Sequence, residues 1–270
     1  MQVAEALALA STLGVARLDA QLLLAHRLQR PRVWLLAHDD SPINAALATA
    51  YAADLERRAG GEPVAYLVGE REFHGLALRV TPAVLVPRPE TEVLVDWALE
   101  LLAGRAAKVI DLGTGSGAIA LAVRHRCPAA TVTATDASAA ALAVAADNAR
   151  RLGLPVDFAC GDWWQTVPGR QFDLALSNPP YVSGDDPHLA ALQHEPRTAL
   201  TPEGDGLDAL RRIVADAPGH LKQGAWLLLE HGYDQAEAVQ GLLRARGFET
   251  PVSRHDLAGL PRCTGARWPG

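Results

Sequence analysis

The chain has 270 residues, 49% of them hydrophobic and 21% charged, which is enough to bury a large core and more than one domain. Its 25 basic and 31 acidic residues give a net charge of −6, which argues against a protein that holds nucleic acid mainly through phosphate contacts. Its three cysteines stand far apart without a CxxC spacing, so a disulfide scaffold and a zinc site are poorly supported and a reducing cytoplasm is the default location.

Residues 1–62 carry helical patterns. Apolar residues recur at helical spacing in "VAEALALAS", "RLDAQLLLAHRLQ", "PRVWLLAH" and "NAALATAYAADLERRAGG", where paired glycines end the last segment. These segments predict a small helical bundle. Because Glu5, Arg17 and Asp19 interrupt the Ala- and Leu-rich start, we expect no signal peptide and no membrane span.

The residue pattern changes between residues 63 and 88. Short β-branched or aromatic runs are broken there by Gly and Pro, in "VAYLVG", "REFHGLALRV" and "AVLVPRP". Such runs favour strands. The segment therefore predicts a β-hairpin linker.

Residues 89–270 alternate between strand and helix patterns. After the helix "ETEVLVDWALELLAG", the expected strands are "KVIDLG", "TVTATD", "VDFACGD", "FDLALSN", "GAWLLLEHG" and a last pair around "FETPVSR" and "CTGARW". Helices are expected from Gly117, from Ser138 to about Arg151, near 206–219 and up to about Arg246. This alternation predicts an α/β fold with a doubly wound, mostly parallel sheet.

A glycine-rich turn follows the first strand of this region, in "VIDLGTGSGAIALAV". Gly113, Gly115 and Gly117 allow the backbone to turn sharply and let a ligand approach without Cβ atoms in the way. Read as G-x-G-x-x-[G/A], the turn suits a dinucleotide pyrophosphate. Asp136, at the end of the second strand, would then bind a ribose. Read as D-x-G-x-G-x-G, it suits S-adenosylmethionine. The loop alone does not decide between these cofactors.

Two further positions near this turn are candidates for a nucleotide. Asp162 and Trp163, in "CGDWW", follow the third strand, where an adenine would lie between a polar acceptor and an aromatic face. The alternative for this pair is a surface turn with a packed tryptophan. For Asp136 the alternative is an N-cap of the following helix.

The segment "SNPPYV", residues 177–182, follows the fourth strand and opens onto the same edge of the sheet as the glycine loop. Pro179 and Pro180 lack an N–H and fix the backbone, so the Asn178 side-chain oxygen stands beside a rigid row of carbonyls. Fixed acceptors suit an NH₂ group on a planar carbon, because they orient a weakly nucleophilic nitrogen and favour the charge that develops on it. Tyr181 is placed to stack on the planar group.

A hydride transfer to a nicotinamide gains nothing from such acceptors, so this segment favours S-adenosylmethionine over a dinucleotide. The alternative is a rigid turn at the end of a strand with Tyr181 in the core. Glu72, His74, Glu230 and His231 border the expected pocket, but single His or Glu residues at strand ends are more often structural. No metal is expected.

The glycine loop together with "SNPPYV" resembles the class I methyltransferases that act on planar amines, which include DNA adenine-N6 enzymes and protein glutamine methyltransferases. The segments "GGEPVAYLVGEREFHGLALRV", "VLVPRPETEVLV", "HEPRTAL" and "DLAG" resemble the PrmC/HemK family, which methylates the glutamine of the GGQ motif in peptide chain release factors. After "DLAG" the sequence departs from the family pattern, which leaves the pairing of the last strand open.

The resemblance covers nearly the whole chain and implies a Rossmann-like class I methyltransferase with a helical substrate-docking domain (1–62), a hairpin linker (63–88) and a methyltransferase domain (89–270). It implies release factors as partners, S-adenosylmethionine as cofactor, a cytoplasmic monomer and no direct contact with nucleic acid. The implied cofactor-binding residues are Gly113, Thr114, Gly115, Ser116, Gly117, Asp136, Asp162, Trp163 and Asn178. The implied catalytic residues are Asn178, Pro179 and Tyr181, and Pro180 joins them in binding the substrate.

Arg88 to Glu92 and Glu195-Pro196 resemble family elements at the mouth of the active site, and the alternative is charged residues that join linker to domain. An adenine-N6 DNA methyltransferase is the main functional alternative, because the NPPY chemistry permits it equally. A catalytically silent docking module is a second. The acidic charge argues against the first, and the intact motifs argue against the second.

Overall fold

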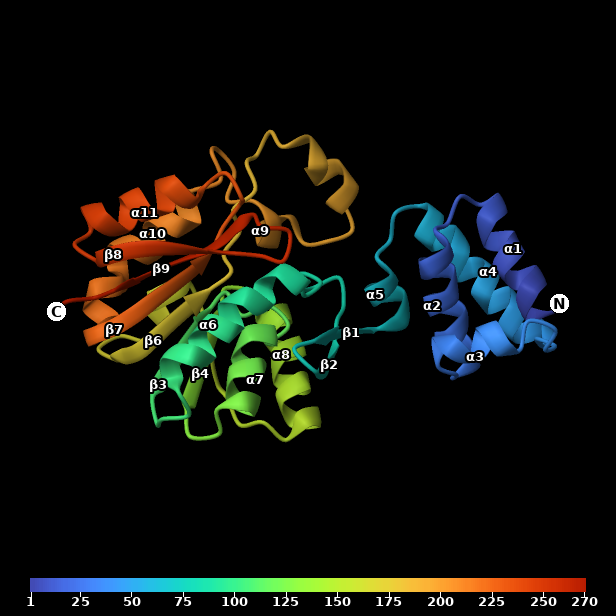
Figure 1. Ribbon diagram of the computed structural model, residues 1–270, viewed down its shortest axis with the longest axis horizontal. Coiled ribbons are helices and arrows are strands. Elements are labelled where there is room, and N and C mark those ends of the chain that lie inside the picture. The colour runs from blue at the N-terminus through green and yellow to red at the C-terminus, as the bar shows by residue number, and fades with distance from the viewer. The chain divides into compact units, whose positions relative to one another are not determined.

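The computed structural model describes residues 1–270, which form two compact units, Met1–Glu70 and Arg71–Gly270. Figure 1 shows the N-terminal unit as helices and the second unit as a twisted sheet covered by helices. None of the helices has the length and apolar character needed to cross a bilayer.

The N-terminal unit is a helical bundle, as the sequence predicted. Its core holds Leu23, Leu24 and Tyr51, and Arg27 pairs with the buried Asp54 at 2.6 Å. Its helices are α1 (Val3–Thr12), α2 (Arg17–Leu28), α3 (Arg32–Ala37), α4 (Ala45–Ala59) and α5 (Val64–Val68).

The prediction of strands throughout 63–88 was wrong at its start. "VAYLVG" forms α5, which begins after Pro63 and ends at Gly69 in the left-handed conformation (φ 80°). Proline suits the start of a helix and glycine its end, and three consecutive residues, 65–67, are buried rather than alternating. The hairpin is confined to β1 (Glu70–Phe73) and β2 (Leu76–Arg79), and residues 80–88 contain no strand.

The second unit contains a seven-stranded sheet of order β5-β4-β3-β6-β7-β9-β8. Strands β5, β4, β3, β6 and β7 are parallel, whereas β9 is antiparallel to both β7 and β8, which settles the pairing of the last strand. The prediction of a doubly wound, mostly parallel sheet is confirmed. The strands are β3 (Lys108–Leu112), β4 (Thr131–Asp136), β5 (Asp157–Cys160), β6 (Phe172–Ser177), β7 (Leu221–Glu230), β8 (Glu249–His255) and β9 (Pro261–Arg267).

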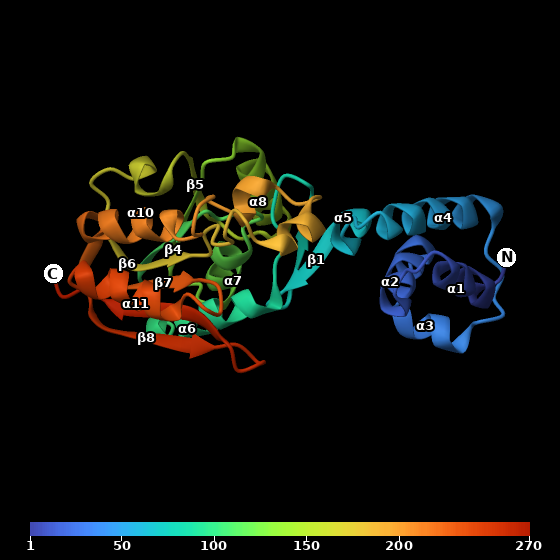
Figure 2. The same cartoon turned by 90° about the horizontal axis from the view of Figure 1, so that it is seen from above.

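Helices cover both faces of this sheet (Figure 2). Val109 faces the apolar cluster that includes α6 and α7, whereas the next residue, Ile110, faces the cluster that includes α10 and α11. Side chains alternate between faces along a strand, so each strand contributes to both layers. The helices are α6 (Glu92–Leu102), α7 (Ala118–Arg126), α8 (Ala139–Leu152), α9 (Arg197–Leu200), α10 (Asp208–Asp216) and α11 (Ala236–Ala245), with 3₁₀ turns η1 (Pro89–Thr91), η2 (Trp163–Thr166), η3 (Pro187–Leu192) and η4 (Ala217–His220).

The strand order reverses at β3 and β6, which are hydrogen-bonded neighbours. Leu112, the last residue of β3, is paired with Ser177, the last residue of β6. The glycine loop and the NPPY segment therefore leave the sheet side by side. In open α/β sheets this reversal point, at the carboxyl ends of the strands, is where ligands bind.

Candidate active site

A cavity of about 340 Å³ lies at the carboxyl ends of β3, β4 and β6, within the second unit. Residues predicted from the sequence line much of it, namely Gly113, Thr114, Gly115, Ser116, Asp136, Trp163, Asn178 and Pro180. The structure thus brings together the loop, the acidic residue at the end of β4, the tryptophan after β5 and the segment after β6.

Four predicted residues do not line this cavity. Gly117 is buried at the start of α7 with φ 85°, and a Cβ there would lie 3.0 Å from Leu121 and 3.2 Å from the Ala145 Cβ, so it allows helices to pack closely. Asp162 lines a neighbouring hollow. Pro179 and Tyr181 line a smaller one of about 100 Å³.

Four backbone N–H groups of the glycine loop are already hydrogen-bonded within the protein. The N–H groups of Gly113 and Thr114 both donate to the Thr135 carbonyl at 2.9 Å, and that of Gly117 donates to the Thr114 carbonyl at 2.9 Å. The Gly115 N–H donates to Asp136 Oδ2 at 2.9 Å. A pyrophosphate cradle needs free N–H groups. These contacts argue against the dinucleotide alternative.

The Asp136 carboxylate accepts from two backbone N–H groups, those of Gly115 and Ser138, both at 2.9 Å. The helix cap is Ser138, whose Oγ accepts from the Ala141 N–H at 3.1 Å. The N-cap alternative for Asp136 is therefore wrong. Its side chain lines the cavity and joins the glycine loop to the end of β4.

Asp111 lies fully buried at the base of the same loop. Its Oδ2 accepts from the Thr114 hydroxyl at 2.6 Å and from the Ala120 N–H at 3.2 Å, while Oδ1 has no partner. Burial raises the pKa of Asp111 to about 7, although these hydrogen bonds oppose the rise. The carboxyl fixes the loop against the first turn of α7.

Trp163 packs on the glycine loop. A Cβ at Gly113 would lie 3.0 Å from the indole Cζ3, so the close approach requires glycine at that position. Trp163 itself has φ 43°. The adjacent Asp162 forms a short ion pair with Arg212. The Trp163 indole therefore borders the cavity, whereas the Asp162 carboxylate pairs with Arg212, which does not line the cavity.

The Asn178 side chain lines both the main cavity and the smaller hollow. Its Nδ2 donates to the Thr91 Oγ1 at 3.2 Å. With the NH₂ group held by Thr91, the remaining amide atom, Oδ1, is an acceptor. The role of this oxygen as an acceptor for a substrate amide stays a prediction.

Tyr181 is held away from the main cavity. Its hydroxyl donates to Glu230 Oε1 at 3.2 Å, and its ring packs partly against the core beneath α10 and α11. Burial raises the pKa of Tyr181, and the nearby Glu230 charge adds to the rise. The ring contributes to the smaller hollow beside Asn178 and Pro179.

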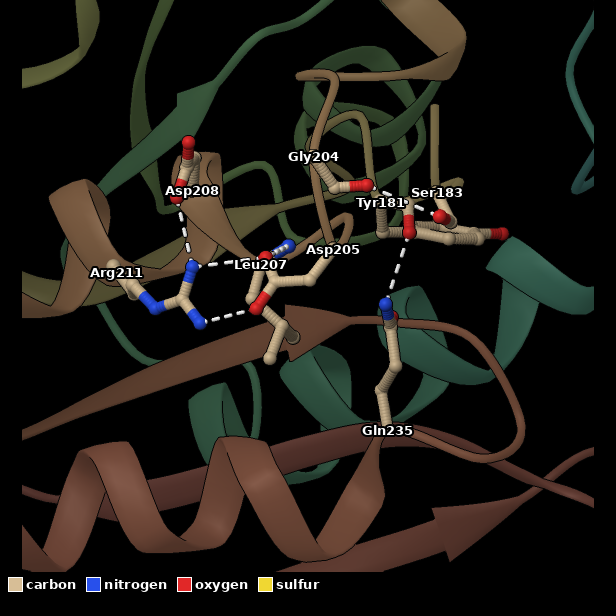
Figure 3. Close-up of polar contacts among 8 residues, drawn as sticks. All are labelled: Tyr181, Ser183, Gly204, Asp205, Leu207, Asp208, Arg211 and Gln235. Atoms are coloured by element: carbon tan, nitrogen blue, oxygen red, sulfur yellow. Dashed lines mark hydrogen bonds and ion pairs between the residues drawn. The ribbon is translucent and has the colours of Figure 1, made fainter. Parts of the chain in front are cut away.

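The loop at residues 204–205, together with the side chain of Gln235, fixes the backbone that follows Pro179 and Pro180 (Figure 3). Gln235 Nε2 donates to the Tyr181 carbonyl at 2.9 Å, and the Ser183 hydroxyl donates to the Gly204 carbonyl at 3.0 Å. Arg211 pairs with Asp205 at 2.5 Å, which ties this loop to α10. The NPPY segment is thus held from both ends.

The sequence reasoning missed most of one cavity wall, which is formed by the irregular segment 82–88. Glu195 fixes this wall, because its Oε2 accepts from the Val86 N–H at 3.0 Å and its Oε1 pairs with Arg88 at 2.5 Å. Arg88 and Glu195 were singled out from the sequence, but Val86 was not. The signal that could have found the wall is the recurrence of proline at Pro82, Pro87 and Pro89, which disfavours a paired strand. Glu72 and His74 instead stabilise the hairpin and its neighbour α6.

Comparison with known proteins gives two family matches that cover most of the chain. Residues 2–69 match the model of the PrmC N-terminal domain, and residues 90–235 match that of the methyltransferase small domain. The release factor glutamine methyltransferase of Bordetella pertussis is 54% identical over 256 residues, covering 93% of this chain and 95% of that protein. That of Xylella fastidiosa (strain Temecula1) is 49% identical over 269 residues, covering 98% of each chain.

Solved structures resemble the fold at low sequence identity. The hMettl16 catalytic domain in complex with the MAT2A 3′UTR hairpin 1 has a TM-score of 0.59 at 14% identity, covering 86% of this chain and 84% of that one. The Thermus thermophilus 16S rRNA N2 G1207 methyltransferase, in complex with AdoMet and guanosine, has a TM-score of 0.56 at 18% identity, covering 74% and 49%. These structures support the class I methyltransferase fold.

Proposed function

This chain belongs to the release factor glutamine methyltransferase family, and on that premise we propose that it transfers a methyl group from S-adenosylmethionine to the glutamine side-chain amide in the GGQ motif of peptide chain release factors. The observation that carries the proposal is the meeting of the glycine loop and the NPPY segment at one cavity, at the ends of adjacent strands. The reaction would support translation termination.

The cavity suits S-adenosylmethionine, which when bound supplies an electrophilic methyl group on a sulfonium. Among the residues lining the cavity, Arg88 is the one Arg or Lys, and it is already paired with Glu195. A site with a half-buried carboxylate, Asp136, and no unpaired cation favours a cationic ligand over a pyrophosphate. We assign residues 113–116 and Asp136 to the amino-acid and ribose portions, and Trp163 to the adenine, with Asp162 as a polar neighbour released from Arg212.

The acceptor glutamine is proposed to present its amide where the main cavity meets the smaller hollow, because Asn178 lines both. Asn178 Oδ1 and the Pro179 carbonyl would accept the two amide N–H bonds, Pro180 would hold the backbone rigid, and Tyr181 would form the hollow's wall. These acceptors orient the nitrogen and stabilise the positive charge that develops on it. A protonated amide loses its proton readily, so we assign no general base.

We further propose that the enzyme acts as a cytoplasmic monomer, that the N-terminal bundle docks the release factor, and that nucleic acid is not a direct ligand. The net charge of −6 supports the last point. The division of the chain into two compact units, one of them the helical bundle, supports a separate docking role for the bundle.

The function is tested by incubating the purified protein with labelled S-adenosylmethionine and either unmethylated release factor or DNA. A mass spectrum that locates a single added methyl on the GGQ glutamine is the expected result. Label on DNA alone would overturn the proposal. The role of Asn178 is tested by Asn178→Ala, which should abolish turnover while S-adenosylmethionine affinity by calorimetry stays nearly unchanged.

A further inference from the structure

His231 directly follows β7 and is fully buried, and the proposed mechanism does not use it. Its Nδ1 lies 2.8 Å from the Gly232 carbonyl oxygen, and its Nε2 lies 2.7 Å from the Thr264 hydroxyl oxygen on β9. A half-turn of the ring about its Cβ–Cγ bond would put carbon atoms at both contacts. Because a buried polar group without a partner is costly, the two hydrogen bonds hold the ring in one orientation.

Gly232 connects this ring to the NPPY segment through Gln235. The Gly232 carbonyl also accepts from the Gln235 N–H at 3.0 Å, and the Gly232 N–H donates to Gln235 Oε1 at 2.8 Å. Gln235 Nε2 donates to the Tyr181 carbonyl at 2.9 Å (Figure 3). A peptide N–H can only donate and a carbonyl can only accept, so the Gln235 amide has one possible orientation. The backbone that follows the two prolines is therefore anchored to the peptide group that His231 holds.

We propose that His231 is a positioning residue for the methyl transfer, an inference that rests on the proposed function. Its ring does not line the cavity or the smaller hollow, so it acts through Gln235 and not by touching the substrate. By donating to the turn after β7, it keeps Gln235 within reach of the Tyr181 carbonyl. The proposed acceptors, Asn178 and Pro179, directly precede this anchored stretch, so their position depends on it.

The proton of the His231 ring lies on Nδ1. A carbonyl can only accept a hydrogen bond, so the nitrogen that faces Gly232 must be the donor. Burial lowers the pKa of His231, which keeps the ring neutral, and Nε2 is then an acceptor for the Thr264 hydroxyl. The tautomer that Gly232 requires is therefore the one that Thr264 supports.

A chain of hydrogen bonds behind Thr264 supports the same tautomer. With its one proton donated to His231, Thr264 accepts from the Ser253 hydroxyl of β8 at 2.7 Å. The Ser253 oxygen in turn accepts from Gln240 Nε2 of α11 at 2.9 Å. The Gln240 amide is itself oriented, because its Oε1 accepts at 2.7 Å from Arg244, which can only donate. The chain thus runs in one direction, from a guanidinium on α11 to the carbonyl that His231 holds.

Two substitutions at His231 separate its two hydrogen bonds. The NH₂ group of asparagine falls near the position of Nδ1 and can still donate to Gly232, whereas the longer glutamine side chain carries its amide to the position of Nε2. With S-adenosylmethionine and release factor saturating, His231→Asn should keep kcat within about twofold of the wild-type value, and His231→Gln should lower it about tenfold. Cofactor Kd measured by calorimetry should be nearly unchanged in both variants, since the glycine loop follows another strand.

A matched control separates positioning from the general loss of a buried hydrogen bond. Thr133→Val removes a buried hydroxyl of β4 that accepts from Arg170 at 2.8 Å, and it should lower stability while leaving kcat unchanged. Thermal unfolding of all three variants sets an assay temperature at which each is folded.

One carbonyl signal reports the anchor directly. Tyr181 and Val182 form the only Tyr-Val pair in the sequence, so protein labelled with ¹³C at tyrosine carbonyls and ¹⁵N at valine gives a single correlated signal, that of the peptide between them. Gln235→Ala should move this signal by removing the hydrogen bond at the Tyr181 carbonyl. His231→Gln should move it in the same direction, and His231→Asn should leave it in place.

A normal kcat or an unmoved signal in His231→Gln, or equal kcat losses in both His231 variants, would overturn the inference. A wild type that never methylates release factor would instead refute the proposed function, since the labelled signal needs no substrate.

Discussion

Gly206 is the residue at which a single methyl group should disturb the NPPY segment most directly. A Cβ there would lie 2.3 Å from the Tyr181 carbonyl oxygen and 3.1 Å from both Gln235 Nε2 and the Ser183 N. Contacts below 3.0 Å force a shift, and the nearest atom is backbone, which cannot rotate away. In Gly206→Ala the Tyr181 carbonyl would therefore have to retreat by about 0.7 Å, breaking its 2.9 Å hydrogen bond from Gln235.

That retreat has a predictable effect on turnover. Tyr181 lies three residues after Asn178, so the acceptors for the substrate amide move with it, and a misplacement approaching 1 Å costs about 10- to 100-fold in kcat. The left-handed φ of +78° adds about 1–2 kcal/mol of strain for alanine. Cofactor affinity should change little because the glycine loop is on another strand.

Gly204→Ala is the matched control. Gly204 has φ +58°, but a Cβ there meets nothing within 4 Å. This variant should lose about 1–2 kcal/mol of stability from backbone strain and keep its kcat. Initial rates of release factor methylation, with thermal unfolding in parallel, compare the two. Gln235→Ala removes the hydrogen bond to the Tyr181 carbonyl without introducing a steric clash, and it should lower kcat several-fold. Equal kcat values for the two glycine variants would refute the idea that the Tyr181 backbone keeps the acceptors of Asn178 and Pro179 in place.

Other changes test the cavity and its supports. Gly117→Ala should destabilise the fold by about 1–3 kcal/mol in thermal unfolding, because its Cβ would meet Leu121 and Ala145. Gly115→Ala has open space around its Cβ, so it should chiefly weaken cofactor binding, which calorimetry measures. Glu195→Gln should weaken the hydrogen bond from the Val86 N–H, loosen that cavity wall and raise the cofactor Kd several-fold. Asp111→Asn should raise the urea unfolding free energy relative to wild type by about 2–4 kcal/mol more at pH 8 than at pH 5.

The sequence predicted the parts of the site that local pattern encodes. The glycine loop and "SNPPYV" each follow an apolar strand, and the rule that parallel strands end at one edge is sufficient to bring Gly113 near Asn178. The bundle in residues 1–62 is local for the same reason, since helical spacing identifies its apolar faces.

The missed features depend on contacts between distant residues. The bond from Val86 to Glu195 spans 109 residues and that from Asn178 to Thr91 spans 87. No short window contains both partners, so the resemblance placed Glu195 at the mouth of the site, but the pattern could not predict that it bonds Val86. Gly117 shows the opposite error, because a glycine in a ligand-binding pattern proved to be required by helix packing.

The two buried carboxyls near the site, Asp111 and Glu230, make the stability of the fold depend on pH. Asp111 and Glu230 have pKa values near 7, above their ordinary values of 3.8 and 4.5, so the folded state holds protons that the unfolded chain has released. Their contribution to stability is therefore complete below about pH 4 and is lost as pH rises through about 7. Replacing Glu230 with glutamine should therefore raise the free energy of unfolding relative to wild type more at pH 8 than at pH 5, which urea unfolding at the two pH values measures.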